Sequence, residues 1–319
     1  MHLTYRYTQP KDLAEAFPLI KDCSFYPPKE RARLFSFWKF LLKNRMGLSS
    51  VVEDLERPPG KRICAFGMSV FTPDEFVEKA RSALAPPLSR RVFESWLKGQ
   101  RVFLNRKEIA AHNSKGGLNL VVLHYGMEQK PMEEFIALNG KFIESFFYLH
   151  SGYQIKEFLT ENFTPEDTAI TLSHSLFIRR TFPEYGTGGE KIFPHTLVGA
   201  RREELNSREK MFAFALLLRA QPPRFNFSQG EKDVLERALL GETDQEIARS
   251  LHYTVWAVKK RWQGIYEKVG KTNAALFASK DPGGSEENQK VERRRFLLDY
   301  LRTHLEEVRP TLKVRKKRK

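Results

Sequence analysis

The pattern of apolar and polar positions predicts three consecutive helices between Phe227 and Asn273. Ser228-Gln229-Gly230-Glu231 and Thr243-Asp244-Gln245-Glu246 both have the Ser/Thr-x-x-Glu form of a capping box, which marks a helix start. Apolar residues follow each box at helical spacing, and Gly241 can end the first helix in the left-handed conformation. Thr254 can cap the third helix, because its hydroxyl accepts a hydrogen bond from an amide of the first turn. These signals predict two short helices followed by a longer one.

The third predicted helix has one apolar side and one basic side. Val258, Trp262, Ile265 and Val269 fall within about 60 degrees of one another at helical periodicity, so they are expected to pack inward. The segment from Thr254 to Val269 carries four Lys or Arg residues against one Glu. A basic helix fits the major groove of B-DNA, where Lys can donate to guanine or phosphate and Gln can pair with adenine.

Residues 1–220 mix strand-like and helix-like stretches, which predicts an α/β or α+β domain. The predicted strands are His2–Thr8, Ile63–Phe71 and Leu118–His124. The predicted helices are Pro10–Ile20 and Pro28–Lys43. Gln221-Pro222-Pro223-Arg224 then marks a domain boundary, because two prolines remove backbone donors and favour an extended chain.

Length and composition agree with more than one folded unit. The chain has 319 residues, which exceeds one average domain, and its 41% of hydrophobic residues can build two cores. A net charge of +15 attracts phosphate backbones, anionic lipids or acidic proteins by the same electrostatics, so charge alone does not choose among them. The two cysteines, Cys23 and Cys64, exclude a disulfide framework and a four-cysteine zinc site.

Several features indicate where the protein works. Low cysteine usage favours a reducing compartment. The amino terminus lacks a basic region followed by an apolar stretch, and no window holds the roughly 18 apolar residues that a membrane span needs. The histidines are scattered without metal-ligand spacing, so no metal is expected. We expect a soluble, cytoplasmic protein that does not contact membranes.

Residues 285–319 are a third predicted piece. Asp281-Pro282-Gly283-Gly284-Ser285 should interrupt any helix, and 286–308 is then predicted to form one amphipathic helix whose apolar stripe needs a partner surface. The basic tail Lys313–Lys319 is too dense in like charge to pack. Two interpretations of this tail stay open: a solvated end that aids solubility, and a non-specific phosphate contact that raises DNA affinity at low salt.

The three-helix segment resembles the LuxR/GerE family of helix-turn-helix regulators, without a gap, over about 47 residues. The matching positions are Phe227-Ser228-x-x-Glu231-x-x-Val234-Leu235, Gly241-x-Thr243-x-x-Glu246-Ile247-Ala248-x-x-Leu251, Thr254-x-x-Ala257-Val258-Lys259 and Val269-Gly270. The resemblance implies an all-α, tetrahelical helix-turn-helix domain at residues 225–279. It also implies that this domain binds double-stranded DNA and pairs as a homodimer.

The same resemblance implies which side chains contact DNA. Residues that match Lys259, Lys260 and Gln263 touch bases or nearby phosphates, and those that match Thr254 and Lys268 approach the backbone. The full set of expected DNA-binding residues is Thr254, Val255, Trp256, Lys259, Lys260, Arg261, Gln263 and Lys268.

Three positions depart from the family pattern. Ala257 replaces the usual threonine, and Gly264 lies inside the recognition helix at a cost of about 1 kcal/mol. Trp256 occupies a normally small position and has two open interpretations, a DNA contact or an anchor against a neighbouring helix or subunit. The family's operator preference therefore does not transfer to this chain.

Parts of residues 1–220 resemble the Gcn5-related acetyltransferases. The stretches concerned are Tyr7-Thr8-Gln9-Pro10-Lys11-Asp12-Leu13 and Phe147-Tyr148-Leu149-His150-Ser151-Gly152-Tyr153. That family binds the pyrophosphate of acetyl-CoA with a Gln/Arg-x-x-Gly-x-Gly/Ala loop, whereas Met127-Glu128-Gln129-Lys130-Pro131 here has no glycine pair. Tyr148 matches the usual general acid of an enzyme; its alternative role is a packed aromatic beside a turn.

The sequence thus favours a multi-domain transcriptional regulator of the LuxR/GerE type. Its α/β (α+β, acetyltransferase-like) amino-terminal domain is expected to sense a small-molecule or protein effector, with no cofactor and no enzymatic activity. The alternative is an acyl-CoA-dependent N-acetyltransferase-like enzyme with an appended helix-turn-helix. A third hypothesis is an architectural or RNA-binding protein that relies on the basic tail.

Overall fold

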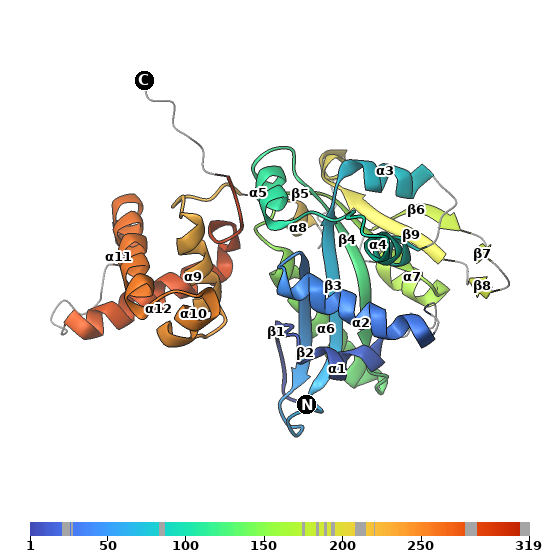
Figure 1. Cartoon of the computed structure of the whole chain (residues 1–319), viewed down its shortest axis with the longest axis horizontal. Coiled ribbons are helices and arrows are strands. Elements are labelled where there is room, and N and C mark those ends of the chain that lie inside the picture. The colour runs from blue at the N-terminus through green and yellow to red at the C-terminus, as the bar shows by residue number, and fades with distance from the viewer. Residues whose placement is uncertain are drawn as a thin grey trace. The chain divides into compact units, whose positions relative to one another are not determined.

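The computed structural model divides the chain into a first unit, Met1–Arg219, and a second unit, Ala220–Lys319, which are considered separately (Figure 1). The residues that the structure describes are 1–20, 26, 28–82, 87–173, 176–182, 185–187, 190–192, 195–207, 215–219, 221–277 and 286–312. The expected turn at 281–285 and the basic tail at 313–319 lie outside the described residues.

A seven-stranded sheet forms the centre of the first unit. Its order is β1 (Leu3–Tyr7), β2 (Gly47–Asp54), β3 (Ile63–Thr72), β4 (Leu118–Met127), β5 (Ile155–Asn162), β9 (His195–Arg201) and β6 (Phe177–Phe182). A separate hairpin consists of β7 (Tyr185–Thr187) and β8 (Glu190–Ile192). Neighbouring strands of the sheet are antiparallel except for β4 and β5, which run parallel.

The helices of the first unit cover both faces of this sheet. They are α1 (Leu13–Ala16), η1 (Phe17–Leu19), α2 (Pro28–Lys43), α3 (Asp74–Ser82), α4 (Leu88–Leu97), α5 (Arg106–Ser114), α6 (Met132–His150), α7 (Pro165–Ser173), η3 (Arg202–Ser207) and α8 (Ala215–Leu218). Helix α2 crosses the near face in Figure 1 and α6 lies behind the sheet. Because β4 and β5 are parallel, the chain must cross over between them, and α6 is that crossover.

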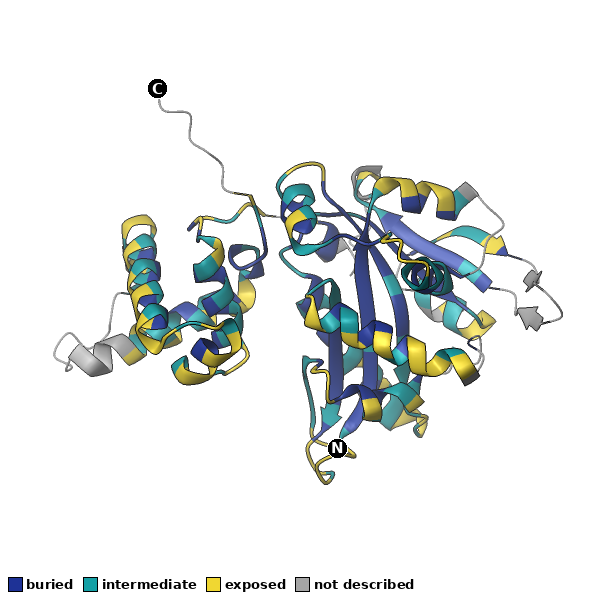
Figure 2. Ribbon diagram, in the orientation of Figure 1, coloured by how far each residue is buried: buried dark blue, intermediate teal, exposed yellow. Residues whose placement is uncertain are grey.

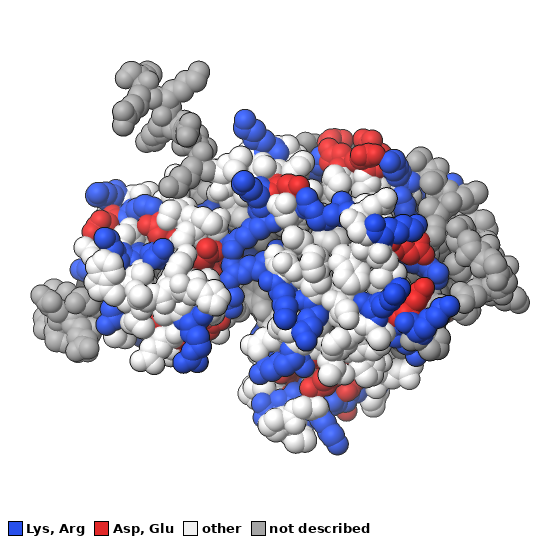
Figure 3. Space-filling view, in the orientation of Figure 1, with Lys and Arg blue, Asp and Glu red and all other residues white. Residues whose placement is uncertain are grey.

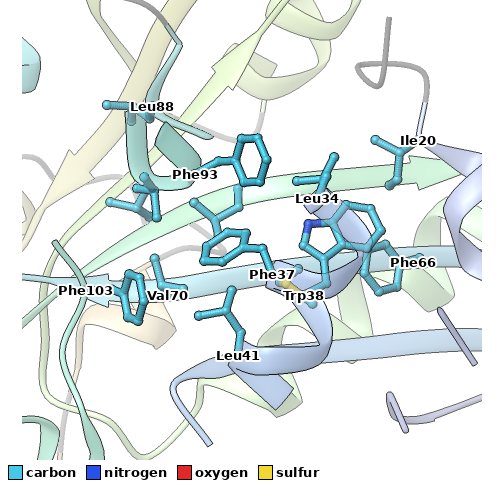
Figure 4. Close-up of a cluster of buried hydrophobic side chains, with 14 of the residues drawn as sticks. Ile20, Leu34, Phe37, Trp38, Leu41, Phe66, Val70, Leu88, Phe93 and Phe103 are labelled. Atoms are coloured by element: carbon cyan, nitrogen blue, oxygen red, sulfur yellow. The ribbon is translucent and has the colours of Figure 1, made fainter. Parts of the chain in front are cut away.

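The largest hydrophobic cluster lies between the sheet and α2 with α4 (Figure 4). Trp38 packs on Phe66 at a ring-centroid distance of 5.1 Å, and Phe37 packs on Phe93 at 5.8 Å. These four aromatic side chains are fully buried, and the central strands are buried along most of their length (Figure 2). Burial of this size is the main stabilising contribution to the sheet domain.

Four of the five elements predicted in the first unit are present near their predicted bounds. The exception is the helix predicted from Pro10 to Ile20, where the structure has α1 followed by η1. Pro18 lies at the start of η1 and has no N–H to continue the α-helical ladder, so the turn tightens there. The sequence pattern placed the apolar residues correctly and overestimated the length of the regular helix.

The second unit is helical in its described residues. Its elements are α9 (Gln229–Leu239), α10 (Asp244–Leu251), α11 (Val255–Thr272), η4 (Ala274–Phe277), α12 (Glu286–Thr303) and η5 (Leu305–Glu307). Both capping boxes form, since Ser228 N donates to Glu231 at 2.5 Å and Thr243 N donates to Glu246 at 2.8 Å. Thr254 Oγ1 accepts from the amide of Ala257 at 3.1 Å and caps α11.

The C-terminal segment packs against α9 within the second unit. Helix α12 contacts α9 and η4 and buries Leu301, while Leu305 and Val308 follow it into the interior. The expected apolar stripe is therefore buried at its C-terminal end, whereas Val291 near the start of α12 is 67% exposed. Two buried charged side chains form hydrogen bonds at this contact: Lys232 donates to the carbonyl of Arg309, and Glu307 accepts from the amide of Arg224.

Basic side chains are spread over the visible surface. Lys and Arg outnumber Asp and Glu on the face in Figure 3, in line with the net charge of +15. Among the described residues, no helix combines the length and the apolar character needed to cross a bilayer. The same part of the chain contains no cluster of His, Cys, Asp or Glu that could hold a metal ion.

Candidate functional site

The parallel strands β4 and β5 diverge in the middle of the sheet. Their pairing runs from Leu118 with Ile155 to Val121 with Leu159 and ends there, although β4 continues to Met127. A bulge on β4 accompanies the divergence. Met68 pairs with His124 and Ser69 with Val122, so Leu123 is an additional residue that bends the strand.

A cavity of about 160 Å³ lies where the two strands diverge, on the face that α6 covers. Its wall is mostly apolar. Phe142, Ile143 and Phe146 come from α6, Val122 from β4 and Phe158 from β5. We call this space the β4–β5 cavity.

One end of the cavity carries a chain of neutral hydrogen bonds. Tyr125 Oη donates to Asn162 Oδ1 at 3.3 Å, and Asn162 Nδ2 donates to Thr171 Oγ1 at 2.9 Å. Thr171 Oγ1 in turn donates to the carbonyl of Asp167 at 2.6 Å. Asn162 is 1% exposed, so β5 and α7 hold its amide in one orientation. This end can accept or donate hydrogen bonds to a polar group of a ligand.

Ser69 and His150 form a second polar pair on the cavity wall. Ser69 Oγ lies 2.6 Å from His150 Nε2, and His150 Nδ1 lies 2.7 Å from the carbonyl oxygen of Phe146. A carbonyl can only accept, so Nδ1 carries the imidazole hydrogen and Nε2 accepts the proton of the Ser69 hydroxyl. β3 supplies the serine and the last residue of α6 supplies the histidine.

The loop from β4 to α6 does not fit the pyrophosphate of coenzyme A. The N-cap of α6 is Pro131, and its first turn carries Glu133 and Glu134, which repel an anion from the helix N-terminus. Glu128 in the loop is paired with Arg57 at 2.7 Å, and this pairing lowers the pKa of Glu128. Lys130, the cation of the loop, is paired with Glu128 at 3.6 Å and Glu134 at 3.4 Å, so the nearby cations are already engaged by carboxylates.

Tyr148 does not line the cavity. Its ring contacts Tyr5 and Tyr7 of β1 at centroid distances of 5.7 and 6.4 Å. Tyr148 is thus a packed aromatic beside the edge strand, the alternative role that the sequence left open. The tyrosine that does line the cavity, among the described residues, is Tyr125 of β4.

In the second unit, six of the eight expected DNA-binding residues are exposed on α11 and its cap. They are Thr254, Val255, Trp256, Lys259, Lys260 and Gln263. The indole of Trp256 is 69% exposed, and the ammonium group of Lys260 lies 5.1 Å from its ring centroid. Val258, Trp262, Ile265 and Val269 are buried on the opposite side, as the helical periodicity predicts.

The two other expected contacts are engaged within the chain. The guanidinium of Arg261 lies 4.0 Å from the ring centroid of Tyr253, and its Nη1 donates to the carbonyl of Ala257 at 3.0 Å. Lys268 forms an ion pair with Glu231 of α9. Arg261 and Lys268 therefore stabilise the arrangement of the helices, and their cations are less available to an external partner.

Sequence reasoning did not find Ser69, His150 and Asn162 as site residues. Ser69 and His150 lie 81 positions apart. Neither occurs in a motif with fixed spacing. The one signal was the resemblance of residues 147–153 to an acetyltransferase segment, which contains His150 and drew attention to Tyr148 instead.

No protein-family model and no curated protein matches the chain. Solved structures do match the first unit. The C-terminal condensation domain of Ebony with beta-alanyl-dopamine has 14% identity and a TM-score of 0.39, over 63% of this chain and 99% of that one. Arabidopsis thaliana NAA60 in complex with a bisubstrate analogue has 16% identity and a TM-score of 0.39, over 62% of this chain and 97% of that one. Spermidine/spermine N-acetyltransferase SpeG from Vibrio cholerae has 12% identity and a TM-score of 0.35, over 66% of this chain and 98% of that one.

These comparisons contradict the expectation that the chain is not an enzyme, because several of the matched structures are N-acetyltransferases. That expectation came from the missing glycine pair, which concerns only the phosphate contacts of a donor. The first unit is a mixed α/β sheet domain.

Proposed function

We propose that the first unit is an acyltransferase-type enzyme that takes the acyl group of a thioester into the β4–β5 cavity and passes it to an amine. The observation that carries this proposal is the divergence of β4 from β5 beyond Val121 over an apolar cavity. Beyond this residue, no strand among the described residues pairs with the edge of β4 that faces β5, so its peptide groups can bond to the amides of an extended ligand.

The size and polarity of the cavity suit a short acyl chain. Each buried methylene contributes about 0.8 kcal/mol, and a cavity of about 150 Å³ is known to hold a ligand as large as benzene. The β4–β5 cavity has about 160 Å³ and presents Phe142, Phe146 and Phe158 to its occupant. The hydrogen bonds at Asn162 provide the polar end where a carbonyl or an amine can be oriented.

The start of α6 and the paired cation of the loop before it, Lys130, support recognition of the thioester arm rather than of a nucleotide. Glu133 and Glu134 disfavour a pyrophosphate at the helix N-terminus. We therefore expect butyryl-N-acetylcysteamine, which contains the thioester and one amide of the pantetheine arm, to react at least as well as butyryl-CoA.

Release of free thiol from butyryl-N-acetylcysteamine tests this proposal, with and without a primary amine, for the full chain. Ile143→Trp fills the cavity and should abolish turnover, whereas Ile136→Trp on the same helix should leave it unchanged. Ile143 lines the cavity and Ile136 is 63% exposed. Equal turnover in the two variants, or no saturable turnover with thioesters from acetyl to octanoyl, would overturn the proposal.

A second candidate function, DNA binding by the second unit, is favoured by the exposed basic side of α11. We propose that this unit acts as a LuxR/GerE-type helix-turn-helix in a homodimer, and that the acylation chemistry of the first unit is coupled to transcription. Lys259, Lys260 and Gln263 are exposed on the helix that Thr254 caps. Lys and Gln on such a helix can donate to base edges and phosphates in the major groove.

A duplex selected by the wild-type chain from a random-sequence pool provides the probe for this function. The double variant Lys259→Ala with Lys260→Ala should bind it at least about tenfold more weakly, with a salt dependence lower by up to about two units in slope. Lys271→Ala, an exposed lysine at the other end of α11, is the control. Unchanged affinity in the double variant, or no enriched duplex, would exclude this function.

A further inference from the structure

We propose that Ser69 and His150 are a nucleophile and its general base, and that Ser69 carries the acyl group as an ester before the amine receives it. This inference rests on the proposed acyltransferase function and specifies its chemistry. Both residues line the β4–β5 cavity; His150 lies in the segment 147–153, where the sequence singled out Tyr148 as the general acid, and Ser69 lies in no such segment.

The hydrogen bonds of the pair match those of an activated serine. Ser69 Oγ lies 2.6 Å from His150 Nε2 and 3.4 Å from the carbonyl of Leu48, so the imidazole is the better acceptor of the hydroxyl proton. Phe146 O holds the hydrogen of Nδ1 at 2.7 Å, which leaves Nε2 unprotonated and directed at the serine. A nucleophile, a base and a group that orients the base are the three parts this catalysis requires.

The position of the pair in the sheet brings it to the reacting group of the ligand. Ser69 pairs with Val122, which directly follows the last β4 residue that pairs with β5. The serine therefore lies beside the point where the strands diverge. His150 is 1% exposed, and its ring packs on Phe146 at a centroid distance of 4.2 Å, so the base is rigid and shielded from bulk water.

Another buried serine on α6 provides a contrast. Ser145 Oγ lies 3.1 Å from Ser50 Oγ and donates to the carbonyl of Phe142 at 2.7 Å. It is as buried as His150 and has hydrogen bonds of similar length, but neither of these two bonds leads to a base. Ser145 is thus a matched control for burial and hydrogen bonding without nucleophilic activation.

The proposed steps balance without any redox partner. Ser69 Oγ attacks the thioester carbonyl carbon while His150 Nε2 takes the hydroxyl proton; the carbon–sulfur bond breaks and the thiolate leaves with that proton. The product is an ester of Ser69. The amine nitrogen then attacks this ester, His150 takes a proton from the nitrogen and returns it to Ser69 Oγ, and an amide leaves. Water in place of the amine gives the free acid.

Rapid mixing of the full chain with butyryl-N-acetylcysteamine, acid quenching and peptide mass spectrometry test this inference. We expect a butyryl group on Ser69, and fragmentation separates Ser69 from Cys64, the buried thiol in the same tryptic peptide. Ser69→Ala and His150→Gln should lose the adduct and slow thiol release by about 100-fold or more. Ser145→Ala should keep both.

The outcomes separate this inference from the proposed function. Amine acylation by the wild-type chain with no ester on Ser69 under any quench time, or a wild-type rate in Ser69→Ala, would overturn the dyad and leave the acyltransferase proposal standing. No thiol release and no saturable binding would overturn both. If Ser69→Ala does not fold, Ser69→Cys keeps a nucleophile of similar size, and a butyryl thioester on that cysteine supports the inference while an unmodified, folded variant contradicts it.

Discussion

The surroundings of the β4–β5 cavity in the first unit and one contact of the second unit bury polar groups of different kinds; elsewhere the first unit also buries carboxylates, among them Asp54, Glu157 and Glu161. In the first unit, Ser50, Ser69, Ser145, His124 and His150 are all buried, and hydrogen bonds join the neutral groups of Ser50 and Ser145, of Ser69 and His150, and of His124 and Tyr26. The second unit has a seam between α9 and the C-terminal segment, where a lysine and a glutamate are buried instead. The two regions show two ways in which a polar group is accommodated without water.

At the seam, backbone groups bond to each charge, and the hydroxyl of Thr311 also accepts from Lys232 Nζ at 2.7 Å. Lys232 is 1% exposed and its Nζ donates to the carbonyl of Arg309 at 2.6 Å. Glu307 is 0% exposed and accepts from the amides of Arg224 and Phe225 at 2.6 and 3.0 Å. Ions buried in this way are costly unless every partner is present, so they specify one packing of the segment. Burying a neutral polar group costs less free energy than burying an ion. Such groups can therefore lie beside a cavity and take part in chemistry.

The largest effect is expected at the seam. Glu307→Ala leaves two amides of the linker without their acceptor, which should destabilise the second unit by about 3 kcal/mol. Hydrogen exchange of the α9 amides in the full chain measures the loss. Glu306→Ala, the neighbouring position outside this contact, should change stability by less than about 0.5 kcal/mol. Equal protection in the two variants would remove the difference between the units.

Burial also raises the pKa of Glu307, and this sets the direction of its pH dependence. A carboxyl whose pKa is higher in the folded state stabilises that state below its unfolded pKa and loses this contribution as pH rises through the folded value. The Glu307→Gln variant is neutral at all pH values and should abolish this part of the dependence.

His124 should produce the next largest effect, in the first unit. Burial lowers the pKa of His124 to about 3, so the folded state binds fewer protons than the unfolded chain. Its contribution is present above the unfolded pKa of about 6.5 and is lost as pH falls, by about 2 kcal/mol between pH 6.5 and 5. Urea unfolding at both pH values measures this loss. His124→Phe should reduce the slope; an unchanged slope would show that another group is responsible.

A smaller effect is expected for a neutral serine. Ser145→Ala removes the bonds to Ser50 and to the carbonyl of Phe142, at a cost of about 1 kcal/mol. Ser114→Ala on α5 loses a similar bond, to the carbonyl of Ala110, in a half-buried place and should cost less. Thermal melting of both variants ranks them. The reverse ranking would mean that burial does not govern the strength of these neutral bonds.

The smallest effect is expected where a charge of the second unit is half-exposed. Arg294 of α12 pairs with Asp244 at 2.9 Å and lies 4.5 Å from the ring centroid of Trp262. Because water screens the pair, Arg294→Ala should cost only about 0.5 to 1 kcal/mol, with a dependence on salt. Hydrogen exchange of the α10 amides at two salt concentrations measures this loss of stability. Arg293→Ala, at an exposed position of the same helix, is the control. A loss as large as that of Glu307→Ala would contradict the role given to burial.

The elements of the second unit were more predictable than the site of the first. Ser228, Thr243 and Thr254 all cap helices at the predicted positions, because a cap joins residues two or three positions apart. In the first unit β1 was predicted from its alternation and β3 and β4 from their apolar runs, whereas the four other strands of the sheet were not predicted. Their order, the parallel pair β4–β5 and the bulge at Leu123 follow from contacts over long sequence separations that the pattern does not contain.

The amino-acid sequence by itself determined the local features: the capped helices of the second unit, the strands β1, β3 and β4, and the basic side of α11. The tertiary structure alone decided that β4 separates from β5, that Ser69 meets His150, and that Lys232 and Glu307 are buried at one seam. The reason is physical. Hydrogen bonds within a helical turn depend on neighbouring residues, whereas strand pairing and the burial of charges depend on segments that only folding brings together.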